Sequence, residues 1–417
     1  MERELLEGLK AVQKASRKLI GISDDLKKQI LNEVADLATN RSESILEANV
    51  KDLARMDPED PKYDRLLLNQ DRLQGIADDM RSVAALTNPL GQVLDEHAKE
   101  NGLIISRVSV PIGVIGVVYE SRPNVTFDVF ALTFKTGNAC VLKGSRDAAD
   151  SNEAIVAVIK EVLRKYNLEE ALLLAPAARE ALPVILTAEG YVDCIIPRGS
   201  QGLIDFVRKN ASIPVIETGA GIVHTYVDAS ATVEKAKAIV LNAKTRRVSV
   251  CNALDCLIIH QDLISALPMI VKGMDERFGV EIMADDRSFG VLTGHYQESL
   301  LKPAEESDYG VEWLSHKMTI KVVDSLEEAL EHIATYSSKH SEAIVAEDQS
   351  VIDQFLMRVD AACVYANAST AFSDGSEFGL GAEIGISTQK LHARGPMGLR
   401  EMTSYKWIVK GDGQIRA

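Results

Sequence analysis

The sequence lacks any apolar run approaching the roughly 18 residues that a membrane span requires. It also lacks an export signal at its start, where charged residues appear from Glu2 onward. Positive charge is scarce, because 46 Lys and Arg stand against 61 Asp and Glu, a net charge of −15. We therefore expect a cytoplasmic protein with no membrane or nucleic-acid partner, in which anionic ligands meet local basic sites.

Cysteine is rare too, with five residues in 417. The count is odd, no Cys-x-x-Cys pair occurs, and no histidine stands at zinc-finger spacing, so we expect reduced thiols and no metal site. Four of the five lie in apolar, strand-like segments and are interpreted as core residues: Cys140, Cys194, Cys256 and Cys363. Only Cys251 has a polar neighbourhood.

The Gly-x-Gly-x-x-Gly turn of many nucleotide-binding proteins is missing after every candidate strand. The chain instead alternates apolar strands with helices, which predicts parallel α/β sheets. In the first half we expect strands at 114–118, 139–143, 171–175, 191–196 and 213–217, and helices at 124–136, 148–165, 178–188 and 201–209. In the second half we expect strands at 254–259, 320–323, 343–345 and 362–366, and helices at 230–243, 264–277, 325–335 and 349–358.

Three segments lie outside this alternation. Residues 1–80 place apolar side chains at helical spacing, and Ser23 is positioned as a helix N-cap. Residues 103–110 alternate as a strand with one solvated face or one arm of a hairpin does, and residues 405–409 are an aromatic and β-branched strand. An apolar strand near the end of a chain usually pairs with another strand.

Cys251 follows Lys244, Arg246 and Arg247 and precedes a predicted strand. Nearby cations lower the pKa of a thiol and raise the fraction of nucleophilic thiolate. The alternative is that Cys251 is one more small buried residue, which is the commoner fate of cysteine. The polar surroundings favour the nucleophile.

Asn124 and the pair Gly199-Ser200 each follow a predicted strand and begin a helix. The amide of Asn124 could donate to a developing oxyanion, or the residue could cap its helix. Backbone N–H groups at Gly199-Ser200 could meet a pyrophosphate, although plain helix capping explains the same pair.

Two further groups have several interpretations. Glu217 ends a predicted strand, where its carboxylate could be a general base, a structural acceptor or a solvated group. His392 and Arg394 lie in a glycine-rich turn that could hold a carboxylate or phosphate, although an ordinary surface turn has the same composition.

Four long stretches, at 111–124, 242–252, 378–387 and 388–398, resemble the gamma-glutamyl phosphate reductase family, a divergent branch of the aldehyde dehydrogenase superfamily. The last two stretches are specific to this family. The resemblance implies an aldehyde-dehydrogenase-like α/β fold, with two parallel-sheet domains and a small oligomerisation arm. The implied activity is the NADPH-dependent reduction of L-glutamate 5-phosphate to glutamate 5-semialdehyde, in proline biosynthesis.

The resemblance also implies roles for individual residues. Cys251 would be the nucleophile and Asn124 the oxyanion donor. The cofactor would be held by Lys143, Gly199, Ser200 and Glu312. The substrate would be held by Arg122, Arg246, Arg247, His392 and Arg394. Asp255 departs from the family pattern, which has Glu there by our expectation.

The same resemblance assigns the domains. Residues 1–98 and 111–222, with part of 376–400, would bind the cofactor, and residues 223–375 would carry Cys251. Residues 99–110 and 401–417 would form the arm of a homodimer or homotetramer, and a transient contact with glutamate 5-kinase is possible. The alternatives are a water-dependent aldehyde dehydrogenase with Glu217 as its base, and a non-catalytic homologue.

Overall fold

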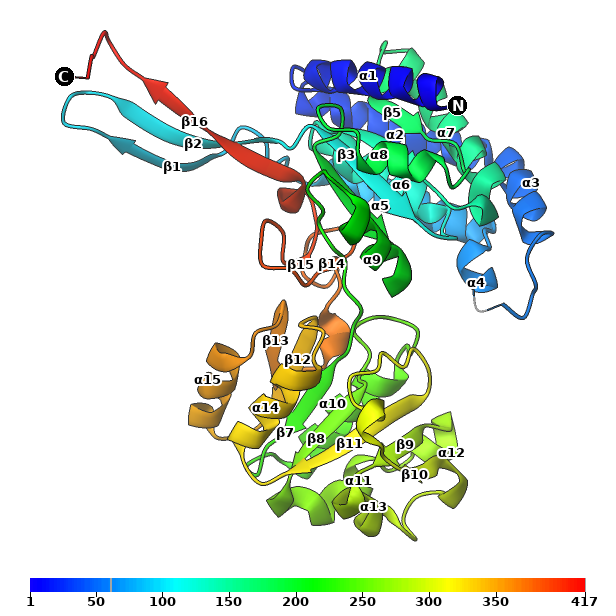
Figure 1. The fold of residues 1–417 in the computed structure, drawn as a ribbon, viewed down its shortest axis with the longest axis vertical. Helices are drawn as coiled ribbons and strands as arrows, with labels where there is room; N and C mark the ends of the chain where they lie inside the picture. The colour runs from blue at the N-terminus through cyan, green and yellow to red at the C-terminus, as the bar shows by residue number, and fades with distance from the viewer. Residues whose placement is uncertain (61, 417) are drawn as a thin grey trace. The chain divides into compact units, whose positions relative to one another are not determined.

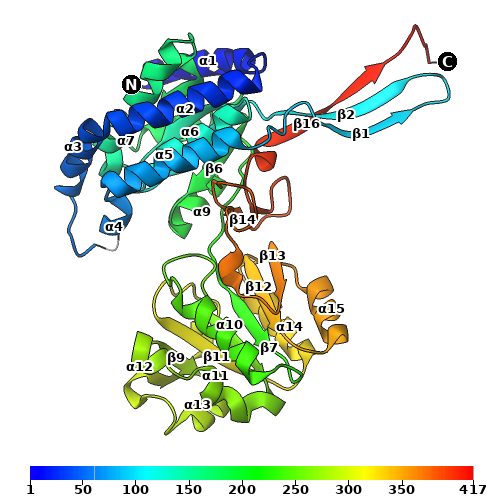
Figure 2. The same cartoon turned by 180° about the vertical axis from the view of Figure 1, so that it is seen from behind.

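The computed structural model describes residues 1–60 and 62–416. It divides into two compact units, drawn in Figures 1 and 2. Unit 1 contains residues 1–218, 379–385 and 396–417, and unit 2 contains residues 219–378 and 386–395. Along the described residues, no helix combines the length and apolarity that crossing a bilayer requires.

Unit 1 is built on a parallel four-stranded sheet with the order β5-β4-β3-β6. Its strands are β3 (Val114–Tyr119), β4 (Ala139–Lys143), β5 (Leu172–Leu174) and β6 (Cys194–Arg198). The expected strand at 213–217 is wrong, because Val215 forms only an isolated bridge to Ile195. Pro214 has no N–H to donate there, which limits further pairing.

Helices cover both faces of this sheet (Figures 1 and 2). On one face α6 and α7 pack on the strands, with α2 and α5 over them, and on the other face lie α1 and α8. The bounds are α1 (Glu2–Leu19), α2 (Asp24–Asn40), α3 (Ser42–Leu53), α4 (Tyr63–Leu66), α5 (Gln70–Ala85), α6 (Asn124–Lys135), α7 (Ala149–Arg164), α8 (Ala181–Leu186) and α9 (Gln201–Asn210). The expected N-cap is confirmed, since the side chain of Ser23 accepts a hydrogen bond from the Leu26 N–H.

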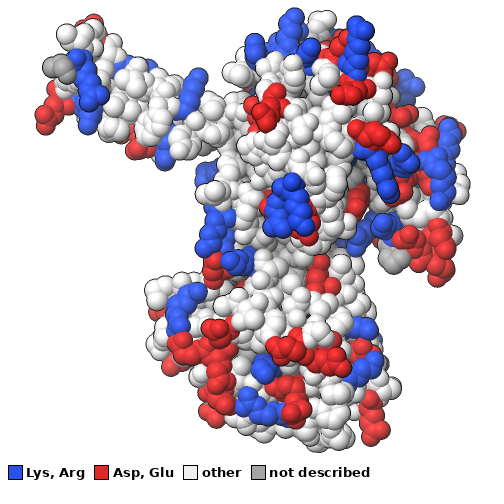
Figure 3. Space-filling view, in the orientation of Figure 1, with Lys and Arg blue, Asp and Glu red and all other residues white. Residues whose placement is uncertain are grey.

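Three antiparallel strands of unit 1 form a separate arm, in the order β1-β2-β16. They are β1 (Val93–Ala98), β2 (Ile104–Pro111) and β16 (Thr403–Lys410), so the hairpin begins before residue 99. Apolar side chains remain exposed on all three strands, and Figure 3 shows a mostly uncharged surface along the arm with basic and acidic side chains among it. The most exposed are Val93 at 58%, Tyr405 at 52%, Trp407 at 53% and Val409 at 57%.

Unit 2 is built on a parallel seven-stranded sheet with the order β10-β9-β11-β8-β7-β12-β13. The strands are β7 (His224–Val227), β8 (Cys256–His260), β9 (Glu281–Ala284), β10 (Leu301–Pro303), β11 (Lys317–Val323), β12 (Ser341–Val345) and β13 (Cys363–Ala366). Four of these match the expected strands, whereas β7, β9 and β10 were missed. The missed strands are only three or four residues long, too short for a clear periodicity.

Helices lie on both faces of the second sheet as well. The apolar layer under α10 to α13 and the layer under α14 and α15 form two separate cores. The helices are α10 (Val233–Thr245), α11 (Leu267–Ile270), α12 (Met274–Phe278), α13 (Asp286–Leu292), α14 (Leu326–Tyr336) and α15 (Gln349–Arg358). The expected helix at 264–277 is wrong as one element, because Gly273 adopts a left-handed φ of 86° that ends one helix and precedes the next.

Candidate active site

Cys251 differs from the other cysteines in exposure. Its side chain is partly exposed in a turn just before β8, whereas the other four are between 1% and 6% exposed, which confirms that they are core residues. None of the five forms a disulfide. A nucleophile must reach its substrate, so Cys251 is the thiol whose position suits covalent chemistry.

The backbone around Cys251 is held from two sides within unit 2. A side-chain carbon added at Gly221 would lie 1.6 Å from the carbonyl oxygen of Cys251, so only glycine permits this approach. On the next residue, the buried Asn252 amide donates to the backbone carbonyl of Ser373 at 3.0 Å, and the Thr370 hydroxyl donates to the Asn252 carbonyl at 2.8 Å. These contacts fix the turn that presents the thiol.

Glu312 also contacts Gly221 in unit 2. Its Oε1 accepts a hydrogen bond from the backbone N–H of Gly221 at 2.8 Å. The structure therefore brings two candidate residues, Cys251 and Glu312, next to the same glycine. The sequence separates them by 61 positions (312 − 251 = 61), so this proximity depends on the fold.

The basic cluster expected beside Cys251 is split by the fold. Lys244 is not accessible to an anion, because it is fully buried and its Nζ donates to the Leu254 carbonyl at 2.8 Å. Burial lowers the pKa of Lys244 to about 8, although the nearby Asp255 carboxylate opposes the shift. Arg246 and Arg247 are exposed, because they follow the last turn of α10 instead of facing its buried side.

The turn at 388–394 is bound to an acidic residue of unit 2. Arg394 donates from Nη2 to Asp360 at 2.7 Å, and Lys390 forms an ion pair with the same carboxylate at 2.9 Å. Hydrogen bonds from Lys390 and then Arg394 hold the pKa of Asp360 far below its usual range. His392 is exposed and has a left-handed φ of 65°. Of the two predicted anion-binding residues, Arg394 already has a carboxylate partner in this structure.

In unit 1, Asn124 is the first residue of α6, and its side chain does not cap the helix. The capping alternative is therefore wrong. The amide Nδ2 donates instead to Asp128 Oδ2, one helical turn along, at 3.0 Å. An amide carries two N–H donors, so one can be held by Asp128 while the other points to a ligand.

Asp128 was not singled out from the sequence. Burial raises the pKa of its carboxyl to about 7, and the charge of Asp79 acts in the same direction. The i, i+4 spacing of Asn124 and Asp128 on a predicted helix was the one signal that could have found it.

The Gly199-Ser200 turn of unit 1 lies beside the strand ends where parallel sheets bind ligands. Chain order reverses between β3 and β6, and such switch points at the carboxyl ends of strands are ligand sites. The Ser200 backbone N–H donates to Glu120 Oε2 at 2.8 Å, and the Ser200 hydroxyl to Oε1 at 3.1 Å. A carboxylate thus occupies the position at the start of α9 where a pyrophosphate is expected.

Lys143 ends the neighbouring strand β4 and is 6% exposed. Its Nζ donates to the backbone carbonyls of Gly144 at 2.8 Å and Ala177 at 3.2 Å. Burial lowers its pKa, and the charge of Arg146 lowers it further. The ammonium is thereby directed to the carboxyl end of the sheet, where the cofactor ribose is expected.

The remaining two candidates of unit 1 are Glu217 and Arg122. Glu217 does not end a strand, and its Oε1 lies 4.0 Å from Arg208 Nε. Arg122 is partly exposed in the connection from β3 to α6, on the same strand end as Asn124.

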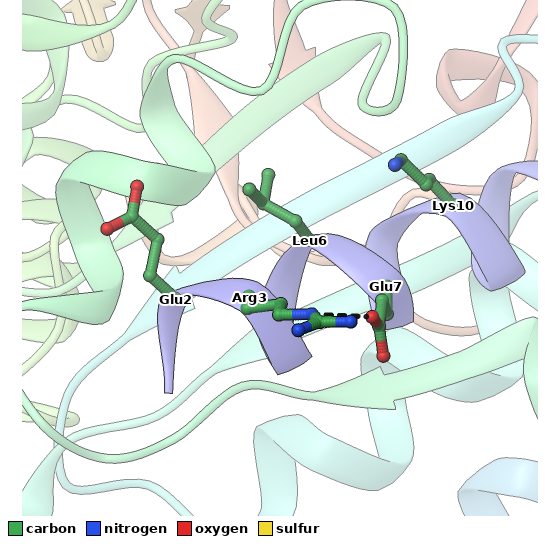
Figure 4. A pocket seen from close by; sticks show the side chains of 5 residues that line it. All are labelled: Glu2, Arg3, Leu6, Glu7 and Lys10. Atoms are coloured by element: carbon green, nitrogen blue, oxygen red, sulfur yellow. Dashed lines mark hydrogen bonds and ion pairs between the residues drawn. The ribbon is translucent and has the colours of Figure 1, made fainter.

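A hollow of about 530 Å³ lies elsewhere on unit 1, over the outer face of α1. Figure 4 shows that its five lining side chains, Glu2, Arg3, Leu6, Glu7 and Lys10, all come from this one helix. Arg3 forms an ion pair with Glu7 at 3.2 Å. A single helix face cannot enclose a ligand, so the hollow carries no functional argument.

The two parallel-sheet units have an aldehyde-dehydrogenase-like architecture, and Cys251 is the one partly exposed cysteine. An acetylating aldehyde dehydrogenase from Geobacillus thermoglucosidasius matches with a TM-score of 0.69 and 15% identity over 100% of this chain and 98% of that one. The crystal structure of gamma-glutamyl phosphate reductase from Thermotoga maritima matches with a TM-score of 0.95 and 41% identity, covering 99% of this chain and 100% of that chain.

Relatives at the sequence level agree. Gamma-glutamyl phosphate reductase of Chlorobaculum parvum is 58% identical over 413 residues, which are 99% of this chain and 98% of the relative. The enzyme of the same name in Bacteroides fragilis is 58% identical over 407 residues, which are 97% of this chain and 98% of the relative. No protein-family model matches the chain. The chain belongs to the gamma-glutamyl phosphate reductase family.

We expect Asp128→Asn to flatten the pH dependence of stability. The raised pKa means that the native state holds a proton more tightly than the unfolded chain, so stability present below about pH 4 is lost as the pH rises to about 7. The loss is at most about 4 kcal/mol, since one pKa unit is about 1.4 kcal/mol. Urea unfolding at pH 5 and pH 8 measures it, with the exposed Asp25→Asn as control. Equal pH dependence in wild type and Asp128→Asn would contradict the assignment.

Proposed function

We propose that this protein reduces L-glutamate 5-phosphate to L-glutamate 5-semialdehyde with NADPH, releasing phosphate, as the second step of proline biosynthesis. Membership of the gamma-glutamyl phosphate reductase family supports the reaction. The observation that carries the mechanism is the single partly exposed cysteine, Cys251, in a turn held by Gly221 and Asn252. The compartment would be the cytoplasm, where five thiols without a disulfide persist.

The Cys251 thiolate attacks the γ-carbonyl carbon, and the tetrahedral intermediate expels phosphate to leave a thioester. NADPH, when bound, supplies the hydride that reduces the thioester carbonyl. The resulting thiohemiacetal oxyanion then re-forms its carbonyl and breaks its carbon–sulfur bond, which releases the aldehyde and regenerates the Cys251 thiolate. One difficult reduction is thus divided into two easier steps.

Both tetrahedral species carry an oxyanion. In this proposal the Asn124 amide donates one N–H to the oxyanion and the other to Asp128, and the backbone N–H of Cys251 is the second donor. The bond to Asp128 orients the amide before the substrate arrives. A donor oriented in advance stabilises the developing charge without a cost of reorganisation.

The cofactor would lie across the carboxyl ends of β3, β4 and β6, with Lys143 at the ribose and Gly199 and Ser200 at the pyrophosphate. The switch point between β3 and β6 supports this placement, but the Glu120 carboxylate now accepts both hydrogen bonds of Ser200. Glu120 has to leave this position for the cofactor phosphates to use the same donors. Glu312 would hold the nicotinamide ribose.

The preference for NADPH over NADH rests on a cation near Lys143. Arg146 is exposed, and its Nη2 lies 4.0 Å from the exposed Glu180, which leaves the guanidinium accessible to a 2′-phosphate. Binding of the substrate is assigned to Arg122, Arg246, Arg247, His392 and Arg394. Association with the glutamate 5-kinase that makes the labile acyl phosphate stays a prediction of the family resemblance.

The reverse reaction tests the function. With glutamate semialdehyde, in equilibrium with its cyclic imine, we expect NADP⁺ reduction that requires inorganic phosphate and is slower with NAD⁺. Cys251→Ser should lose at least about 10³-fold in rate, because the thioester cannot form. The control is Cys363→Ser, which changes a buried thiol of the same unit.

Activity without phosphate would instead favour the rival function, a water-dependent aldehyde dehydrogenase with Glu217 as its base. The proposed reaction has no hydrolytic step and needs no such base. No activity under any condition would favour a non-catalytic homologue, and full activity in Cys251→Ser would remove the nucleophile from the mechanism.

Arg246→Ala and Arg247→Ala should each raise KM for the acyl phosphate by about 10-fold, because a charge-assisted hydrogen bond contributes about 1.5–3 kcal/mol. Steady-state kinetics at constant ionic strength measures the change. Lys272→Ala removes an exposed charge of the same unit and serves as control. An unchanged KM in both arginine variants would mean that neither binds the substrate.

We propose that the arm joins copies of this chain into a homodimer or homotetramer. Strand β16 is one of the two edge strands of its sheet, and Tyr405, Trp407 and Val409 are each more than half exposed on it. An exposed apolar edge strand pairs readily with another chain. Trp407→Lys should therefore lower the mass measured by light scattering, while Lys406→Gln should not. An unchanged mass in Trp407→Lys would place the contact elsewhere or show a monomer.

A further inference from the structure

A row of polar side chains crosses one face of the large sheet of unit 2. The parallel register aligns four residues on adjacent strands, in the order Glu342, His224, Cys256 and Thr319. Neighbouring strands lie about 4.8 Å apart, so side chains at aligned positions on one face are adjacent. Apart from Lys321 of β11, the rest of this face is largely apolar, and α14 and α15 cover it.

His332, on the covering helix α14, packs against this row of side chains. Its Nε2 lies 3.6 Å from Cys256 Sγ, and the rings of His332 and His224 are edge to face with centroids 5.6 Å apart. The sulfur and one ring nitrogen of each histidine all lie within 4.8 Å of one another. His224, Cys256 and His332 are 0%, 2% and 8% exposed, so the three donors meet inside the core.

The other ring nitrogen of His224, Nδ1, already has a hydrogen-bond partner. This nitrogen lies 3.0 Å from Glu342 Oε2, and the same oxygen accepts the His224 backbone N–H at 2.9 Å. The Ser337 hydroxyl donates to the other carboxylate oxygen. A histidine that binds a metal through one ring nitrogen usually donates its other ring N–H to a carboxylate in this way.

His224 Nε2 is buried and has no hydrogen-bond partner among the described residues. An unpaired buried polar atom is destabilising, and His224 Nε2 is one of a few such atoms among the described residues. Ordinary core packing accounts for the rings of Tyr309 and Tyr336 against His332, but it leaves this nitrogen unexplained. A ligand for its lone pair would account for it.

We propose that unit 2 binds one Zn²⁺ ion through Cys256 Sγ, His332 Nε2 and His224 Nε2. Thiolate and imidazole are the donors that zinc prefers, at about 2.3 Å and about 2.0–2.1 Å, which places donor atoms roughly 3.3–3.6 Å apart. The Cys256–His332 distance of 3.6 Å already meets this, and the three donor groups, which lie within 4.8 Å of one another, have to move closer together to bind one ion. Three protein ligands leave one further position for water.

The protonation states determine how the ion enters. Burial, assisted by the charges of His224 and Lys321, lowers the pKa of His332 to about 3, so its imidazole is neutral. Burial raises the pKa of the Cys256 thiol to about 12. Binding therefore exchanges the thiol proton for the metal and releases one proton to solvent.

Such an ion would link β7, β8 and α14. Strand β8 begins at Cys256, five residues after the proposed nucleophile, and β7 begins three residues after Gly221. The site would stabilise the strand starts that anchor the Cys251 turn, without taking part in the reaction. It is independent of the proposed function, because a metal-binding result does not depend on any substrate.

Cobalt provides the test. The whole protein is used with Cys251→Ser, which removes the accessible thiol, and is titrated with Co²⁺ and then Zn²⁺. We expect one equivalent of Co²⁺ to give a thiolate-to-cobalt charge-transfer band, which Zn²⁺ abolishes, and Zn²⁺ to raise Tm. Adding Cys256→Ser should remove the band and the rise in Tm, and His332→Gln should weaken binding at least about 10-fold.

The matched control adds Cys363→Ser, a buried thiol in the same sheet, and should keep both signals. Circular dichroism confirms that each variant is folded. The proposal is overturned if no stoichiometric band forms, or if the band persists in Cys256→Ser, which would identify adventitious binding.

Discussion

The approach of the Gly221 backbone to the carbonyl of Cys251 is the constraint on which the candidate active site depends. A side-chain carbon at Gly221 would lie 1.6 Å from that oxygen, so the two segments can meet only because the position is glycine. The Gly221 N–H is used at the same time, by Glu312. One residue thus positions both the nucleophile turn and a predicted cofactor ligand, and Asn252 anchors the far side of the turn.

Basic side chains that are close in the sequence have different roles, depending on whether they are buried or exposed. Lys244 lies in the core, where it satisfies a backbone carbonyl, while Arg246 and Arg247 stay in solvent and remain available to an anion. In a protein with a net charge of −15, exposed cations of this kind provide a local positive site that attracts anionic ligands. Two carboxylates likewise accept hydrogen bonds from candidate ligand-binding residues. Glu120 accepts from the Ser200 backbone N–H, and Asp360 accepts from the Arg394 guanidinium.

Much of the fold followed from local pattern. The four strands of the small sheet and four strands of the large one were expected, because apolar runs bounded by turns carry their own signal. The segment at 213–217 has the same composition but gains only one bridge, since Pro214 cannot donate. The pattern at 264–277 predicts one helix, yet Gly273, with its left-handed φ, lies between two short ones. The short strands β7, β9 and β10 carried too few residues to show a period.

By itself the sequence determined the alternating α/β architecture, the family resemblance and the choice of Cys251, because each rests on adjacent residues. Only the tertiary structure decided where side chains point and which distant residues meet. Examples are the bond from Asn124 to Asp128 in place of a helix cap, and the carboxylate of Glu120 at Ser200. Cys256 meets His332 across 76 positions because strand register and helix packing align them. Which strands become neighbours, and which helix lies over them, depends on residues far apart in the chain, so a local pattern does not determine this contact.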